Sequence, residues 1–255
     1  MYFNDVHILL YVLVGIIGLI VGKIVAWCNM RLPENKKVFS KEFIEENKNG
    51  LKANYIFMVC MAIMYILILY KYGLQSGGII QNLDLIKFLF LTPMLVLVIS
   101  IDFKYRIIPN RLTLTMFEIG LIFTFLYGIS NVNFAKEYIL GMIVGSGIFL
   151  GIMLIGWLVS GKEAMGLGDV KFMGAAGLYF GIYGITEIAL LSFFIAAICS
   201  IIILLVRFLI LKKKDEYIAF GPFLSTSAII CIFINSGTII DIFLSFCKMI
   251  GDKIL

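Results

Sequence analysis

The stretch YILGMIVGSGIFLGIMLIGWL, Tyr138–Leu158, runs for 21 residues without a charged side chain. At about 1.5 Å per residue, a helix of this length crosses the ~30 Å hydrocarbon core of a bilayer. Seven other apolar stretches resemble it, although Phe172–Ile185 is short and glycine-rich and could be tilted, re-entrant or merged with its neighbour. The remaining predicted spans are His7–Trp27, Ala53–Tyr70, Leu85–Ile101, Leu112–Tyr127, Ile188–Leu211 and Leu224–Phe246.

The composition of the whole chain is typical of a membrane protein. Of its 255 residues, 62% are hydrophobic and 15% are charged, and the mean hydropathy of +1.05 lies far outside the range of soluble domains. We therefore predict a single all-α integral membrane domain over residues 1–255, embedded in the lipid bilayer, with about eight transmembrane helices. The first apolar run follows MYFNDVH, which lacks the basic start of a secretory signal, so we expect a retained helix.

The charged loops predict how the helices are oriented. If the spans alternate sides, fifteen Lys and Arg residues fall in the loops of one side and five in the loops of the other. Because positively charged loops prefer the cytoplasm, the N-terminus is predicted to lie outside the cytoplasmic membrane, and the polar stretch 29–54 to be a cytoplasmic loop. This orientation also explains the net charge of +5, so we expect no nucleic acid partner.

The cysteines and the histidine argue against several kinds of site. The five cysteines are scattered, mostly within apolar runs, and form no Cys-x-x-Cys pair. The only histidine, His7, lies near the start of the first predicted span, on the outer side. We therefore expect no zinc or other metal and no Ser-His-Asp arrangement.

Two aspartates stand apart from the other acidic residues. Asp102 ends the third predicted span in VISIDFKYRIIPNRLTL, and Asp169 precedes the sixth in GKEAMGLGDVKF. Two helices lie between them, so the predicted topology returns both to the cytoplasmic face. Two adjacent carboxylates share one proton, and such a pair can activate water while polarising a carbonyl, which hydrolyses peptides without a metal. The alternative is two ordinary interfacial carboxylates beside cations such as Lys104 and Lys171.

Two glycines precede the second aspartate. Gly166 and Gly168 would leave room for a substrate backbone and permit unusual dihedral angles. As a nucleotide-binding motif, Gly-x-Gly-Asp is weak, because no strand precedes it and the fuller glycine pattern is absent.

Other polar and small residues within the spans have structural explanations. We expect Glu118 to make a helix–helix polar contact, with a smaller chance of tuning the aspartate pair, and Glu187 to be solvated near the outer interface. Four glycines in the fifth and sixth spans predict close helix packing. They are Gly141, Gly145, Gly174 and Gly177.

The segments around the aspartates resemble a known family. DFKYRIIPNRLT, Asp102–Thr113, and GKEAMGLGDVKFMGAAGLYFG, Gly161–Gly181, resemble the two aspartate motifs of type IV prepilin peptidases, which are membrane aspartyl proteases of the Gly-x-Gly-Asp class. AFGPFLSTSA, Ala219–Ala228, resembles the segment that opens the last helix of the family. The resemblance implies that Asp102 and Asp169 are the catalytic pair. It also implies that Gly166 and Gly168 are the glycines of the motif and that Glu163 and Lys171 occupy its characteristic flanking positions.

The resemblance implies cleavage of the leader from type IV prepilins or pseudopilins at the cytoplasmic membrane face, without a cofactor. Many bacterial members also methylate the new N-terminus with S-adenosylmethionine. The methyltransferase region matches only in part, because Gly22, Arg31 and Pro33 align while Lys23 and Ala26 replace a serine and an asparagine. The loop that often carries four zinc-binding cysteines has none.

Three alternatives remain open from the sequence. The first is a peptidase for prepilin-like or preflagellin-like precursors without methyl transfer. The second is a membrane transporter that uses Asp102, Asp169 and Glu118 as an ion relay. The third is a membrane subunit of a pilus assembly complex without catalytic activity.

Overall fold

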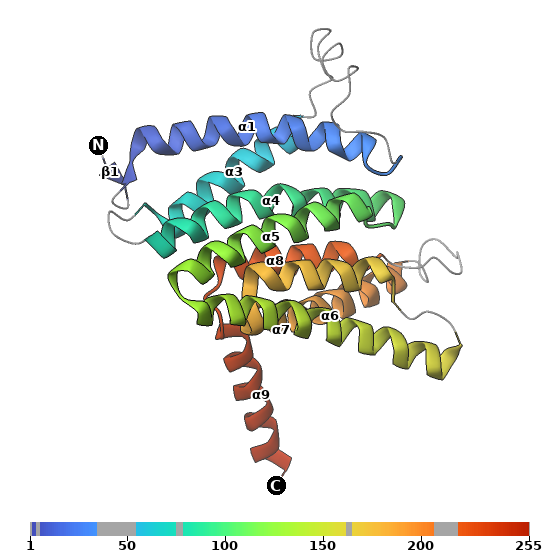
Figure 1. Ribbon diagram of the computed structural model, residues 1–255. Coiled ribbons are helices and arrows are strands. Elements are labelled where there is room, and N and C mark those ends of the chain that lie inside the picture. The colour runs from blue at the N-terminus through green and yellow to red at the C-terminus, as the bar shows by residue number, and fades with distance from the viewer. Residues whose placement is uncertain are drawn as a thin grey trace.

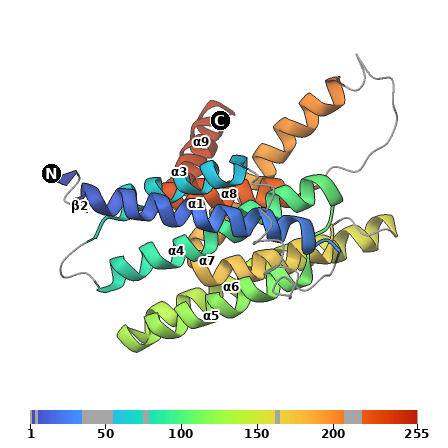
Figure 2. The same ribbon diagram turned by 90° about the horizontal axis from the view of Figure 1, so that it is seen from above.

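The computed structural model describes residues 2–3, 6–34, 55–74, 79–161, 165–206 and 219–254, and these form a bundle of long helices (Figures 1 and 2). The all-α class is confirmed. The only strands in the described part are two residues each, β1 (Tyr2–Phe3) and β2 (Val6–His7), which pair antiparallel and were not predicted. The helices are α1 (Ile8–Arg31), α3 (Tyr55–Tyr72), α4 (Ile79–Tyr105), α5 (Asn110–Ser130), α6 (Val132–Ser160), α7 (Leu167–Val206), α8 (Gly221–Phe233) and α9 (Thr238–Ile254).

Six of the described helices are long and apolar enough to cross a membrane, or seven if the bent pair α8 and α9 counts as one span. This number is below the eight predicted for two reasons. The predicted span Phe172–Ile185 and most of Ile188–Leu211 belong to the single element α7, and the predicted span Leu224–Phe246 is interrupted between α8 and α9.

The element α7 reverses direction at Gly181. This residue has φ 67° and ψ −170°. This backbone conformation lies outside the helical region and is one that glycine adopts more readily than other residues. A Cβ atom at Gly145 of α6 would lie 2.7 Å from both the carbonyl oxygen of Met173 and Cγ1 of Ile185. An uninterrupted helix would hold residues 173 and 185 about 18 Å apart. The two halves of α7 therefore fold back on each other, and both lie against α6.

The predicted close packing of small residues is confirmed where the first half of α7 crosses α6. A Cβ atom at Gly177 would overlap the carbonyl group of Gly141, and one at Gly174 would lie 3.3 Å from Cβ of Ser146. Gly141 in turn faces the backbone of Gly177 and Gly181. Close backbone approach of this kind is how helices associate within a bilayer, where no hydrophobic effect drives them together.

Replacing Gly177 with alanine should therefore destabilise the bundle by about 1–3 kcal/mol, because the added methyl group meets backbone that cannot rotate away. The measurement is thermal unfolding of the purified protein in detergent. Gly147→Ala is the matched control, since a Cβ atom at that helical glycine of α6 meets nothing within 4 Å. Equal melting temperatures for the two variants would contradict the packing described above.

A buried carboxylate of α7 holds the bend between α8 and α9. The side chain of Glu187 is 2% exposed, and its Oε1 accepts hydrogen bonds from the backbone N–H of Ile239, at 2.8 Å, and of Ile240, at 3.5 Å. The expectation of a solvated Glu187 is therefore wrong, because the first turn of α9 supplies donors that a carboxylate satisfies. The axes of α8 and α9 differ by 103°, and α9 leaves the bundle crosswise to the other helices (Figure 1).

A polar cluster ties α4, α5 and α6 together at the end of α4 remote from Asp102. Lys87, which is 2% exposed, lies 2.7 Å from Oδ1 of Asp84 and donates a hydrogen bond of 3.2 Å to the hydroxyl of Tyr138. The hydroxyl of Tyr127 donates to the same Asp84 oxygen at 2.5 Å. Charged groups inside a helical bundle require partners of this kind, so the cluster fixes how three helices pack.

Candidate active site

Asp102 lies in the last turn of α4, where the helix ends abruptly. Arg106 adopts φ 58°, the left-handed conformation, and its N–H donates to the carbonyl oxygen of Asp102 at 2.9 Å, which closes the final turn. The neighbouring side chain of Phe103 is 81% exposed, whereas that of Asp102 is 4% exposed. Asp102 therefore points into the protein, and a buried carboxylate does not fit the alternative of an ordinary interfacial charge.

Asp169 lies in the first turn of α7 and is half-buried. Its N–H donates to the carbonyl oxygen of Gly166 at 3.0 Å, and its carboxylate accepts from the backbone N–H of Gly166. The start of a helix favours a negative charge because the unpaired N–H groups there carry the positive end of the helix dipole. The local sequence thus holds this carboxylate at the N-terminus of α7.

The fold brings the two aspartates together. Both line one cavity of about 710 Å³, to which the α4–α5 connection, residues 165–169 and residues 219–220 also contribute. We call it the carboxylate cavity. Asp102 acts electrostatically on Asp169 across it. The two carboxylates therefore share one cavity, and their catalytic role stays a prediction.

Gly221 contacts Asp102 of this site, a role that its sequence context does not predict. Its backbone N–H donates to the carboxylate of Asp102, and a Cβ atom on Gly221 would lie 2.6 Å from Oδ2 of Asp102. The N-terminus of α8 is therefore pressed against the carboxylate, with its positive dipole end facing a potential negative charge. The glycine–proline pair that opens α8 is a recognisable helix-start signal, but it does not reveal which side chain the helix start approaches.

The two motif glycines differ in their surroundings. Neither has a positive φ, so neither uses the left-handed conformation that glycine permits. A Cβ atom at Gly168 would lie 3.3 Å from Cβ of Ile108, which makes this glycine a close packing contact with the α4–α5 connection. A Cβ atom at Gly166 would lie 3.6 Å from Oδ2 of Asp169, at ordinary contact distance. Gly166 is exposed and lines the carboxylate cavity.

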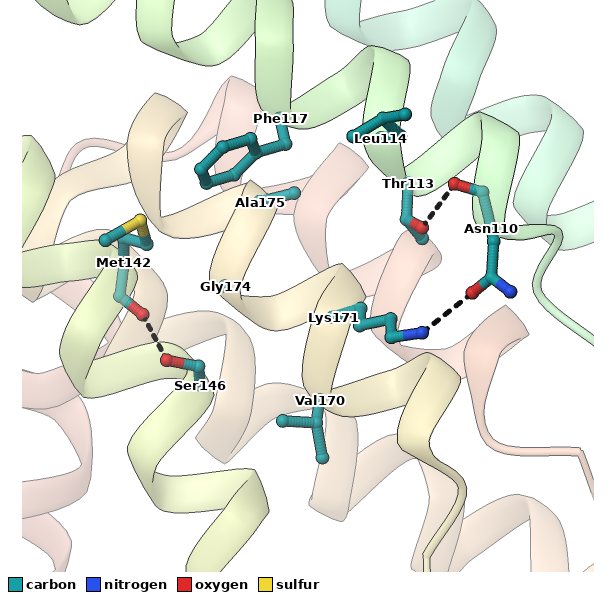
Figure 3. A pocket seen from close by; sticks show the side chains of 10 residues that line it. All are labelled: Asn110, Thr113, Leu114, Phe117, Met142, Ser146, Val170, Lys171, Gly174 and Ala175. Atoms are coloured by element: carbon teal, nitrogen blue, oxygen red, sulfur yellow. Dashed lines mark hydrogen bonds between the residues drawn. The ribbon is translucent and has the colours of Figure 1, made fainter.

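The flanking lysine does not pair with the aspartates. The Nζ atom of Lys171 donates to Oδ1 of Asn110 at 2.9 Å and so connects the start of α7 to the start of α5 (Figure 3). Both residues line the carboxylate cavity. The other flanking position, Glu163, lies outside the described residues.

The residues of the expected methyltransferase region lie elsewhere. A Cβ atom at Gly22 would overlap the backbone of Met58, so this glycine serves the packing of α1 on α3. The guanidinium of Arg31 lies 4.3 Å from the ring centroid of Trp27, and Pro33 follows the end of α1. None of these residues lines the carboxylate cavity. Positions 35–54 of the predicted cytoplasmic loop lie outside the described residues.

Two other expectations concern metals and Glu118. Among the described residues, no group of three or more His, Cys, Asp or Glu side chains lies close enough to hold a metal ion. The side chain of Glu118 is exposed on α5, so the expected helix–helix contact is wrong. Hydropathy alone cannot show which face of a span a single polar residue occupies.

The carboxylate cavity has the parts of a general acid–base site. Two carboxylates face one space, each accepts a hydrogen bond from a glycine backbone N–H, and glycine backbone forms part of the wall. Such a pair can take a proton from water at one carboxylate and donate a proton from the other.

Comparisons with known proteins cover the segment that contains both aspartates. Residues 89–206 match the Type IV leader peptidase family. The chain is 34% identical over 143 residues to a prepilin leader peptidase/N-methyltransferase of Escherichia coli (strain K12). This alignment covers 56% of this chain and 60% of that protein. It is 30% identical over 161 residues to a protein of the same name from Xanthomonas campestris. That alignment covers 61% of this chain and 52% of the relative.

In both cases, therefore, the chain spans less than two thirds of the length of the relative. No solved structure gives a significant match. The matched residues 89–206 contain Asp102, Asp169 and the helices α5 and α6 that join them. Residues 89–206, which supply both aspartates of the carboxylate cavity, are therefore similar to the Type IV leader peptidase family.

Proposed function

We propose that this protein is an aspartic endopeptidase of the cytoplasmic membrane that removes the leader peptide from type IV prepilins or pseudopilins. One observation carries the proposal. Asp102 and Asp169, which come from the ends of two different helices, line the same cavity in the segment shared with leader peptidases. The relatives described above are named for that activity.

In the proposed reaction the ionised aspartate removes a proton from water while the water oxygen attacks the carbonyl carbon of the scissile peptide bond. The protonated aspartate donates a hydrogen bond to the carbonyl oxygen, on which negative charge develops. The tetrahedral intermediate then breaks its C–N bond, and the leaving nitrogen receives a proton from the aspartate pair. No cofactor takes part in these steps.

The proposed topology counts the two halves of α7 as separate crossings, which gives eight crossing segments with α8 as the last. With the N-terminus outside, Asp102, Asp169 and Gly221 then share the cytoplasmic face with the more basic loops. This orientation suits a substrate whose leader remains in the cytoplasm.

The test is incubation of the purified protein, in detergent, with a purified prepilin precursor. The expected result is a single product whose mass corresponds to loss of the leader, with the scissile bond identified by mass spectrometry. An intact precursor after long incubation with folded protein would contradict the proposal.

Methylation of the new N-terminus is the finer part of the proposal. We expect the mature product to gain the mass of one methyl group when S-adenosylmethionine is present and not when it is omitted. The alternative, a peptidase without methyl transfer, predicts the same product mass in both reactions. A mature pilin whose N-terminal amine has been acetylated serves as the negative control.

The transporter alternative finds less support in the structure. An ion relay through Asp102, Asp169 and Glu118 requires these carboxylates to share a path, but Glu118 is exposed on α5 and does not line the carboxylate cavity. Ion uptake by proteoliposomes that requires both aspartates, without proteolysis, would favour the transporter instead.

A further inference from the structure

A second cavity lies beside the carboxylate cavity, between α5, α6 and the first half of α7 (Figure 3). It encloses about 490 Å³, a volume within the usual range of ligand pockets. We call it the apolar side pocket. The side chains that give it an apolar surface are Leu114, Phe117, Met142, Val170 and Ala175.

The polar groups of the apolar side pocket already have partners. The Thr113 hydroxyl donates to the carbonyl oxygen of Asn110 at 3.0 Å, and the Ser146 hydroxyl donates to that of Met142 at 2.7 Å (Figure 3). The Lys171 ammonium donates to the side chain of Asn110. A ligand therefore gains little from polar contacts inside this pocket, and burial of apolar surface dominates its binding.

The apolar side pocket adjoins the carboxylate cavity. Asn110 and Lys171 line both, and their hydrogen bond forms the rim between them. Val170, which lines the pocket, directly follows Asp169 in the first turns of α7. A polypeptide bound with its scissile bond at the aspartates therefore passes within reach of the pocket.

From this adjacency we infer that the apolar side pocket binds a bulky apolar side chain of the substrate polypeptide close to the scissile bond, and that Leu114 and Phe117 set the size it accepts. The inference rests on the proposed function. Burial in a pocket of this kind discriminates between side chains of different size by about 10–200-fold in kcat/KM.

The experiment compares substrates as well as enzymes. Precursors in which each apolar residue near the scissile bond is replaced in turn by alanine or by tryptophan are cleaved by the wild type, by Leu114→Trp, which fills the pocket, and by Phe117→Ala, which enlarges it. Leu121→Trp is the matched control, because Leu121 is an exposed leucine of α5 two turns from Leu114 that does not line the pocket.

At one substrate position we expect the ratio of kcat/KM for tryptophan over alanine to fall about 10-fold or more in Leu114→Trp and to rise by a similar factor in Phe117→Ala, while the control keeps the wild-type ratio. A ratio between two substrates of the same enzyme is insensitive to partial loss of folded protein. Ratios that match the wild type at every position, in variants that cleave, would overturn the assignment and indicate that lipid fills the pocket. If the wild type itself cleaves no precursor, the proposed function fails and this assignment fails with it.

Discussion

Asp102→Asn and Asp169→Asn should each lower leader removal by at least about 10³-fold, within the range expected when a positioned general acid or base is lost. Asparagine has nearly the same shape as aspartate, so the backbone N–H of Gly221 can still donate to the side chain at position 102. The amide cannot exchange a proton with water at neutral pH. The loss is therefore chemical, and the carboxylate cavity keeps its structure.

The measurement is the ratio of mature to precursor prepilin in cells, followed by kcat/KM for the purified variants. Gel filtration and thermal unfolding establish that the variants fold. Asp241→Asn is the matched control, since Asp241 is an exposed carboxylate of α9 that does not line the carboxylate cavity. Normal processing by either cavity variant would remove the aspartic peptidase mechanism and favour a non-catalytic subunit.

Gly221→Ala should lower kcat by about 10²-fold, because displacement of a catalytic group by about 1 Å costs that much. The added methyl group would lie 2.6 Å from Oδ2 and 3.0 Å from Cγ of Asp102. Either the carboxylate rotates away from Asp169 or the start of α8 retreats and withdraws its N–H. Both outcomes disturb the aspartate pair while the rest of the bundle keeps its packing.

The effect of Gly221→Ala is measured as separate kcat and KM values with a purified precursor. A change confined to kcat is expected, because Gly221 contacts Asp102 but does not itself line the cavity. The lining residue at this point is Phe220. Gly147→Ala again provides a glycine-to-alanine control in open space. Equal kcat values for Gly221→Ala and the control would show that the contact with Asp102 is irrelevant to catalysis.

Several features of this protein were predictable from local sequence. Apolar runs of bilayer length predicted the helices α1, α3, α4, α5 and α6, and most of their predicted ends lie within a few residues of the observed ends. The reason is that length and composition determine whether a helix can cross a membrane. The small residues Gly141 and Gly177 predicted a close crossing, because only small side chains permit backbone contact. The ends of the spans predicted that Asp102 and Asp169 face the same side of the bundle.

Other features depended on contacts between segments far apart in the chain. Two spans, Phe172–Ile185 and Ile188–Leu211, were predicted where α7 lies, but the reversal falls earlier, at Gly181, because apolar residues continue on both sides of that glycine and hide its position. Glu187 was assigned to solvent because its partners, the first N–H groups of α9, come some fifty residues later. A hydropathy pattern contains no information about such distant donors.

The sequence alone therefore determined that the chain is a helical membrane protein and which two carboxylates share one end of the bundle, since both follow from local length, polarity and helix count. The tertiary structure decided what surrounds those carboxylates. The start of α8 presents Gly221 to Asp102, and α5, α6 and α7 enclose an apolar pocket beside Asp169. These contacts arise from helix packing, in which a residue's neighbours are set by the shapes of distant side chains.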